Sequence, residues 1–138
     1  MLIDPDGIPH LPVAFMNQDH AEEARLLNTV GEAVDAFRKD GGGKDRVKAA
    51  LEGLYLHTRA HFAREESAMV DASFPAYSFH QAEHVRILGE LGEAERRFDE
   101  TDAGDELAAY LATLPGWLGQ HITSMDAVTA RYVAEWGG

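Results

Sequence analysis

Three short breaks divide most of the chain into four long segments whose apolar residues recur at helical spacing. The breaks are the glycine run Gly41 to Gly43, the stretch Asp71 to Pro75 and the turn Thr101 to Gly104. Glycine and proline interrupt helices, because glycine is too flexible and proline lacks an amide hydrogen. No segment of useful length carries the alternating pattern of a β-strand. The sequence therefore predicts an all-α protein, an antiparallel up-down-up-down four-helix bundle.

The breaks also set the expected bounds of the helices. These are residues 18–39, 44–70, 76–98 and about 105–136. We expect either Asn17 or Asp19 to cap the first helix. Pro115 should divide the fourth segment into a short helix that ends at Leu114 and a second helix that has the proline near its start.

An extended arm is expected before the first helix, at residues 1–16. This stretch contains Pro5, Pro9 and Pro12, and three prolines so close together exclude a helix interior. Its apolar residues suggest that it packs on the bundle. A chain of 138 residues is expected to form a single domain, with the bundle at about 17–136.

Charge and composition exclude several classes of function. The chain has 12 Lys and Arg against 24 Asp and Glu, and the net charge of -12 disfavours nucleic acid and membranes as partners. The absence of cysteine excludes disulfides, thiolate zinc sites and iron–sulfur clusters. Met1 to Pro12 does not read as a secretory signal, and no apolar run is long enough to span a membrane. We therefore expect a cytoplasmic protein.

Histidines and acidic residues recur on the inward faces of all four predicted helices. The seven residues are His20, His61, Glu65, His80, His84, His121 and Asp126. A spacing of four residues places His61 beside Glu65 on one helix face. His121 and Asp126 are five residues apart, about 140° around a regular helix. Either a local wide turn or the reach of the carboxylate must bring these two together.

A metal is the partner that these groups could share. One inward histidine alone is more often a hydrogen-bonded core residue, but four sets on four successive helices disfavour that reading. Burying so many polar groups without a partner would be costly. Seven ligands exceed the needs of one ion, whereas two ions bridged by the two carboxylates would use them all. Imidazole and carboxylate suit iron, and also manganese or zinc.

With these motifs the chain resembles the hemerythrin family from about residue 15 to residue 136. The matching motifs are Asn17-Gln18-Asp19-His20, His61-Phe62-x-x-Glu65-Glu66, His80-x-x-x-His84 and Trp117-Leu118-x-x-His121-Ile122-x-x-x-Asp126. The separations between the motifs match as well. The resemblance implies a non-heme centre of two irons, bridged by carboxylates and an oxo group, that binds dioxygen.

The resemblance also assigns ligands to each iron. The ligands of one iron would be His80, His84 and His121. His20 and His61 would hold the other iron, which keeps one open position where dioxygen binds in the family. Glu65 and Asp126 would bridge the two irons. Glu66, about 100° around the helix from Glu65, is expected to point outward or to contact a ligand rather than to be one.

Other residues surround this expected centre. Trp117, Leu118 and Ile122 match the family positions that line the dioxygen pocket. His57 lies one turn before His61, where the family usually has an aromatic or aliphatic residue. It could bond to a backbone carbonyl, contact a ligand, donate a proton to dioxygen or exchange as a ligand.

The expected function is reversible dioxygen binding for carriage, storage or delivery, rather than catalysis. Bundle diiron oxidases use more carboxylates than this chain offers. Two alternatives stay open. One is a diiron oxidase, peroxidase or nitric oxide reductase, for which His57 is the only indication. The other is a module that senses oxygen or iron and reports it to a protein partner.

Overall fold

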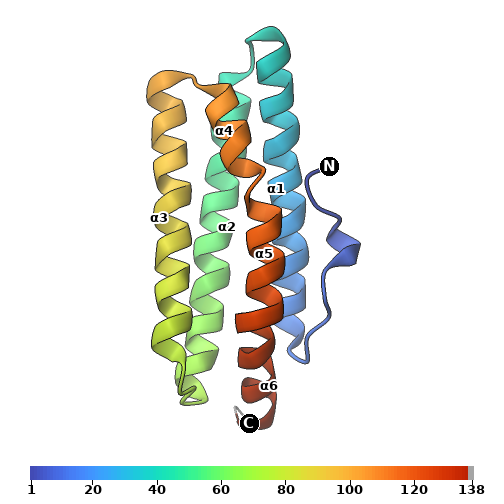
Figure 1. Ribbon diagram of the computed structural model, residues 1–138, viewed down its shortest axis with the longest axis vertical. Coiled ribbons are helices and arrows are strands. Elements are labelled where there is room, and N and C mark those ends of the chain that lie inside the picture. Colours follow the sequence, from blue (N-terminus) through green and yellow to red (C-terminus); the bar gives the residue numbers. More distant parts are fainter. Residues whose placement is uncertain (137–138) are drawn as a thin grey trace.

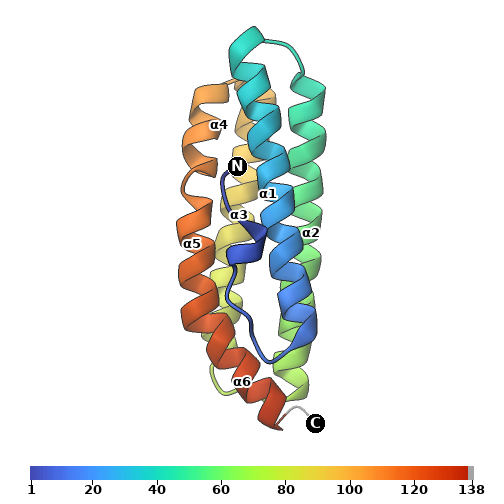
Figure 2. The ribbon, with the colours of Figure 1, turned by 90° about the vertical axis from the view of Figure 1, so that its right-hand side faces the viewer.

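The computed structural model describes residues 1–136, which form a bundle of helical rods (Figure 1). The first three rods are α1 (Ala14–Asp40), α2 (Lys44–Asp71) and α3 (Tyr77–Thr101). The fourth rod consists of α4 (Gly104–Leu111), α5 (Leu114–His121), a π-helical turn (Ile122–Asp126) and α6 (Ala127–Trp136). Successive rods run in opposite directions (Figures 1 and 2). The predicted antiparallel up-down-up-down bundle is confirmed.

The predicted break after the first helix is also confirmed. Gly41 ends α1 with a φ of 72°, and its N–H donates to the carbonyl of Phe37. Residues with a Cβ rarely adopt this left-handed conformation, so glycine suits this position. None of the helices within residues 1–136 combines the length and the hydrophobicity that a membrane-spanning segment requires.

The start of the first helix differs from the prediction. Helix α1 begins at Ala14, and Val13 precedes it without a capping side chain. The expected cap at Asn17 or Asp19 is therefore wrong, and the arm ends at residue 13 rather than 16. Asn17 instead accepts a hydrogen bond from the N–H of Leu11 (2.8 Å) and donates one to its carbonyl (2.7 Å). The amide side chain ties the arm to the helix instead of capping it.

The arm lies along the bundle, as the sequence suggested (Figure 2). Asn28 accepts hydrogen bonds from the N–H groups of Leu2 (2.7 Å) and Ile3 (3.0 Å) and donates one to the carbonyl of Ile3 (2.7 Å). Leu11 is buried in a cluster with Leu118 and Ile122. The arm therefore covers the face of α5 that adjoins the predicted site.

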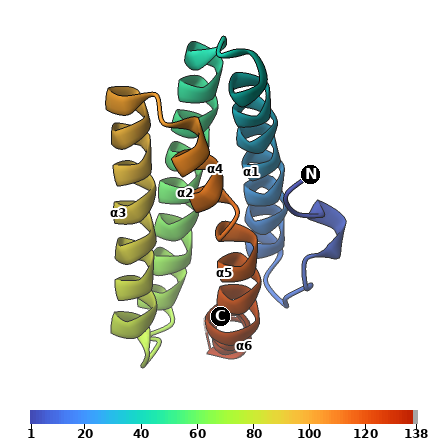
Figure 3. The ribbon, with the colours of Figure 1, turned by 45° about the horizontal axis from the view of Figure 1, so that its top comes forward.

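The fourth rod breaks three residues earlier than predicted. Helix α4 ends at Leu111 rather than Leu114, and Pro115 lies in the first turn of α5, as expected. Figure 3 shows α4 displaced from the line of α5, with α3 beside it. Residues of α3 and α4 line the groove that is described below.

Candidate metal centre

All seven residues predicted from the sequence meet in the interior of the bundle. Each is buried, with an exposed fraction of 3% or less. Histidines come from α1, α2, α3 and α5, and the carboxylates come from α2 and the π-helical turn. Because the rods are antiparallel, residues near the start of α1 and α3 lie level with residues near the end of α2 and α5.

The π-helical turn brings Asp126 to His121. In this turn the N–H of Ala127 donates to the carbonyl of Ile122, five residues back. A five-residue step aligns residues that a regular helix would separate. Asp126 Oδ1 consequently lies 3.2 Å from His121 Nε2. The wide turn was one of the two solutions that the sequence left open.

The two oxygens of Glu65 face two different groups of histidines. Oε2 lies 2.8 Å from His61 Nε2 and 3.4 Å from His20 Nε2. Oε1 lies 3.2 Å from His84 Nε2 and 3.7 Å from His80 Nε2. The carboxylate therefore stands between a group on α1 and α2 and a group on α3.

Asp126 divides its oxygens in the same way. Oδ2 lies 2.9 Å from His20 Nε2, and Oδ1 lies 2.9 Å from His80 Nε2. With His121 also on the Oδ1 side, one side of the carboxylate pair has three histidines and the other has two. This is the arrangement that two bridged ions would need.

Several of these buried atoms lie close to one another but make no well-aligned hydrogen bond within the described residues. They are His20 Nδ1, Glu65 Oε1, His84 Nε2 and Asp126 Oδ1. A buried polar atom without a partner is unfavourable by about 1–3 kcal/mol. Three of the four atoms point into the space between imidazoles and carboxylates, where a cation would satisfy them. The residues present therefore fit a bound metal.

Outer hydrogen bonds orient three of the imidazoles through their Nδ1 atoms. The partners are Glu66 Oε2 for His84 (2.9 Å), Thr129 Oγ1 for His80 (2.7 Å) and Glu23 Oε1 for His61 (3.4 Å). Donation from Nδ1 leaves Nε2 free to bind a cation.

Two of these outer partners were not found from the sequence. Glu23 lies three residues after His20, and Thr129 lies three residues after Asp126. Helical spacing from a ligand would have indicated both. Glu66, in contrast, contacts the cluster histidine His84 and does not itself join the cluster.

The electrostatics of the cluster also favour a cation. Burial lowers the pKa of His61, but hydrogen bonds to Glu23 and Glu65 outweigh it and raise that pKa to about 10. Burial raises the pKa of Glu65 and Asp126, but the surrounding imidazoles lower both overall. The lowered pKa values favour the ionised form of both carboxylates, and the raised pKa values of His20 and His61 favour protons on these two imidazoles. A metal ion would take the place of those protons.

Aromatic rings pack against two of the histidines. The indole of Trp117 stacks on His121 with ring centroids 4.7 Å apart, and Phe62 stacks on His84 at 3.8 Å. Trp117 Nε1 donates to Glu83 Oε1 over 2.7 Å. Hydrogen bonds from Arg86 and Trp117 lower the pKa of Glu83 to about 2, so the carboxylate that orients the indole is ionised.

His57 lies outside the cluster and is half-buried. Its Nε2 lies 3.2 Å from the backbone carbonyl of Asp19 and 3.5 Å from Glu23 Oε1. The same Glu23 oxygen contacts His61, so the carboxylate stands between the two imidazoles. This geometry is that of a histidine bonded to a backbone carbonyl, the first of the roles considered from the sequence.

Comparison with known proteins agrees with this geometry. A family model described as the Hemerythrin HHE cation binding domain matches residues 11–133. A protein named Bacteriohemerythrin from Ralstonia nicotianae is 35% identical over 129 residues, which cover 93% of this chain and 86% of that protein.

Two further relatives carry the same name. The one from Aquifex aeolicus is 28% identical over 136 residues, covering 98% of this chain and 100% of that protein. One from Pseudomonas aeruginosa is 30% identical over 116 residues, which cover 83% of this chain and 71% of that protein. No solved structure matches the chain. The match of the family model over most of the chain, together with the buried cluster, shows that the chain belongs to the hemerythrin family and has a site for a non-heme diiron centre.

Proposed function

We propose that this chain binds dioxygen reversibly at its diiron centre and serves as a carrier, a store or a local source of dioxygen. The observation that carries the proposal is the unequal division of histidines around two shared carboxylates. Three histidines and two carboxylate oxygens would give one iron five protein ligands. Two histidines and two carboxylate oxygens would give the other iron four, and this iron would have room for an outside ligand.

The residue roles in this proposal follow from that division. His80, His84 and His121 would hold one iron. His20 and His61 would hold the second iron, the one that keeps an open position, and Glu65 and Asp126 would each offer one oxygen to either side. When bound, the diiron centre supplies the electrons that dioxygen needs in order to bind.

The surrounding side chains have two tasks in the proposal. Trp117, Leu118 and Ile122 place apolar surface next to His121, and the arm residue Leu11 packs over Leu118 and Ile122. Such walls exclude water and limit the escape of reactive oxygen species. The outer partners of the imidazoles hold the ligand atoms in place. The cytoplasmic setting expected from the sequence is part of the same proposal.

The enzyme and the sensor are less well supported. The enzyme alternative depended on His57. Its ring lies 3.2 Å from the carbonyl of Asp19, and Glu23 links it to His61, with the two ring centroids 5.8 Å apart. The link is made at Nδ1 of His61, away from the Nε2 that faces the cluster. The sensor alternative has no contact within the described residues that favours it.

Repeated oxygenation tests the proposal. Iron-loaded, reduced protein is cycled between air and argon while its ultraviolet–visible spectrum is recorded. We expect a new absorption in air that disappears under argon and returns over several cycles. The variant His61→Leu should lose this reversible change, whereas the matched variant His10→Leu in the exposed part of the arm should keep it. A single irreversible change of the wild-type spectrum on first contact with air would contradict the proposal.

A further inference from the structure

A small cavity lies directly beside the metal cluster, along the axis of the bundle. The layer of side chains next to the cluster consists of Glu23, Thr58, Ile87 and Leu118. Each lies three residues from a cluster histidine of its own rod, in the direction of the α1–α2 connection. All four rods therefore contribute one wall, and we call this space the axial cavity.

A second layer of the axial cavity is wholly apolar. It consists of Leu27, Leu54, Leu91 and Leu114. These leucines are seven residues from the same four histidines, two helical turns along the axis. The axial cavity has a volume of about 20 Å³. One water-sized molecule needs about 10–15 Å³ by this measure, so the space admits one small molecule.

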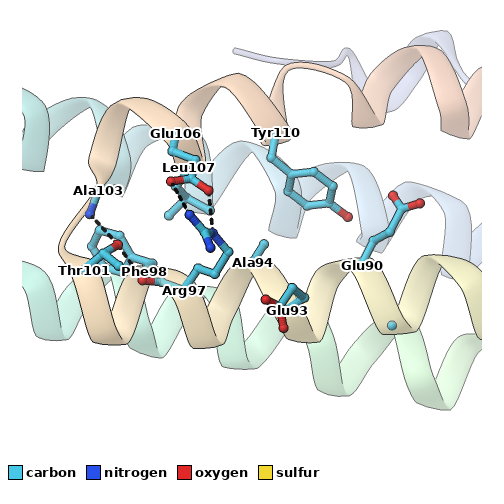
Figure 4. Close-up of a pocket in the computed structure, with 11 residues that line it drawn as sticks. Glu90, Glu93, Ala94, Arg97, Phe98, Thr101, Ala103, Glu106, Leu107 and Tyr110 are labelled. Atoms are coloured by element: carbon cyan, nitrogen blue, oxygen red, sulfur yellow. Dashed lines mark hydrogen bonds and ion pairs between the residues drawn. The ribbon is translucent and has the colours of Figure 1, made fainter.

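The far end of the axial cavity is formed by Tyr110 of α4. The same side chain lines a larger groove of about 450 Å³ between α3 and α4 (Figure 4). This outer groove is open to solvent, with Phe98 and Leu107 in its floor and the ion pair Arg97–Glu106 across it at 2.6 Å. Tyr110 is the one residue that both linings share. The tyrosine ring therefore separates the outer groove from the axial cavity.

The surroundings of the Tyr110 hydroxyl group would allow the ring to move. Its hydroxyl oxygen is buried and has no hydrogen-bond partner among the described residues, so no directional bond fixes the ring. Burial, and then the charge of Glu90, raise the pKa of Tyr110 to about 12, so the ring stays neutral. Figure 4 shows Tyr110 and Glu90 facing each other near one end of the outer groove. Motion of one aromatic ring is enough to join the two spaces.

We propose that dioxygen reaches the metal centre through the outer groove and the axial cavity, and that the ring of Tyr110 controls its passage. The inference rests on the proposed function, because it concerns how the ligand of that site arrives. The walls select for a small, uncharged, apolar molecule. The four leucines of the second layer supply this selectivity, because the glutamates that line the groove, Glu90, Glu93 and Glu106, are each paired with an arginine.

The structure also offers a rival route. A cavity of about 140 Å³ at the surface is lined by Phe79, Val128 and the cluster residue His80. Phe79 is 79% exposed, so this cavity opens directly to solvent. It approaches the three-histidine side of the cluster, whereas the axial cavity adjoins all four rods. Two variants, each of which fills one of the two spaces, distinguish the two routes.

The kinetic test measures dioxygen association and dissociation by stopped flow and flash photolysis in iron-loaded protein. Tyr110→Trp should lower both rate constants by about tenfold, and Tyr110→Ala should raise both, because a passage changes the barrier and not the end states. The equilibrium constant should therefore stay the same. Tyr110→Phe keeps the ring and should behave as wild type, and Val128→Trp should leave the rates unchanged. The route would be overturned if Tyr110→Trp and Tyr110→Ala both had the rate constants of the wild type. It would also be overturned if Val128→Trp were the only variant that slowed dioxygen binding.

Xenon supplies a second readout that does not depend on dioxygen binding. A crystal of the wild-type protein under xenon pressure should show xenon between Leu91, Leu114 and Leu118, and ¹²⁹Xe exchange should be slower in Tyr110→Trp. An axial cavity without xenon would overturn the route even if dioxygen bound reversibly. The wild type could instead fail to bind dioxygen although xenon occupies the axial cavity and Tyr110→Trp slows its exchange. That result would contradict the proposed function alone and would still support the gas passage.

Discussion

In the half of the bundle that holds the α1–α2 connection, the interior is built of leucine, valine and phenylalanine, whereas in the other half the corresponding positions carry histidine and carboxylate. On α2, Leu54 and His61 are seven residues apart on one face, and on α3 His84 and Leu91 repeat the step. The apolar half is stabilised by burial of hydrocarbon. The polar half leaves buried atoms without partners until a cation binds. Folding and metal binding are thus assigned to different halves of the same four rods.

Removing a bridging carboxylate should break the polar half most severely. We expect Glu65→Ala to lose both irons together and to lower the free energy of unfolding by about 3–5 kcal/mol, because buried groups lose their charged partner. Elemental analysis and thermal unfolding measure the two effects. The neighbouring variant Glu66→Ala removes only a contact to His84 Nδ1 and should keep both irons. Retention of two irons in Glu65→Ala would show that this carboxylate is not a bridge.

Truncation in the apolar half should affect stability without affecting the metal. Leu51 is fully buried in the apolar cluster, so Leu51→Ala should lower the free energy of unfolding by about 2–5 kcal/mol. Iron content per folded chain should not change. Leu56 on the same helix is 44% exposed, and Leu56→Ala should cost less than about 0.5 kcal/mol. A loss of iron in Leu51→Ala would mean that the halves are more strongly coupled than described.

A smaller effect is expected where the halves meet. Glu83→Gln weakens the acceptor for the indole N–H of Trp117, and we expect a loss of about 0.5–1.5 kcal/mol with both irons retained. The near-ultraviolet circular dichroism of the indole should weaken, since Trp117 is less firmly stacked on His121. Trp136 is 65% exposed, so Trp136→Phe is a control for the signal of the other indole. An unchanged Trp117 band would show that Glu83 does not orient the ring.

The smallest effect is expected from His57. His57→Leu removes a hydrogen bond to the carbonyl of Asp19 in a half-buried setting, so the free energy of unfolding should change by only about 0.5 kcal/mol. The rate at which the oxygenated protein converts to its oxidised form should match the wild type in stopped-flow measurements. A markedly slower conversion in the variant would restore the role of His57 as a proton donor and strengthen the enzyme alternative.

The bundle could be predicted because its signals are local. Glycine at 41–43 and proline at 75 mark breaks whatever the rest of the chain does, and the apolar stripes define the inward faces. The cap at Asn17 was wrong because the side chain found a better partner in the arm, at Leu11. An asparagine that caps a helix and one that binds the backbone of a neighbouring segment cannot be distinguished in the sequence.

The candidate site was predicted in outline for the same reason. Helical spacing located all seven residues. The five-residue step from His121 to Asp126 required either a wide turn or the reach of the carboxylate, and the π-helical turn is the solution that the structure has. Glu23 and Thr129 were missed, although their spacing from the cluster indicates them. The role inferred for Tyr110 could not be predicted, because it depends on which side chains line the two spaces in the folded chain and not on any local pattern.

The most direct test of the central claim is the iron content of the wild-type chain. Elemental analysis of purified protein, expressed with sufficient iron and assayed against protein concentration, should give two irons per chain. The reason is that Glu65 and Asp126 each turn one oxygen toward the two-histidine side and one toward the three-histidine side. A reproducible value of one iron or fewer, with all seven residues intact, would contradict the shared-carboxylate centre on which the proposed function depends.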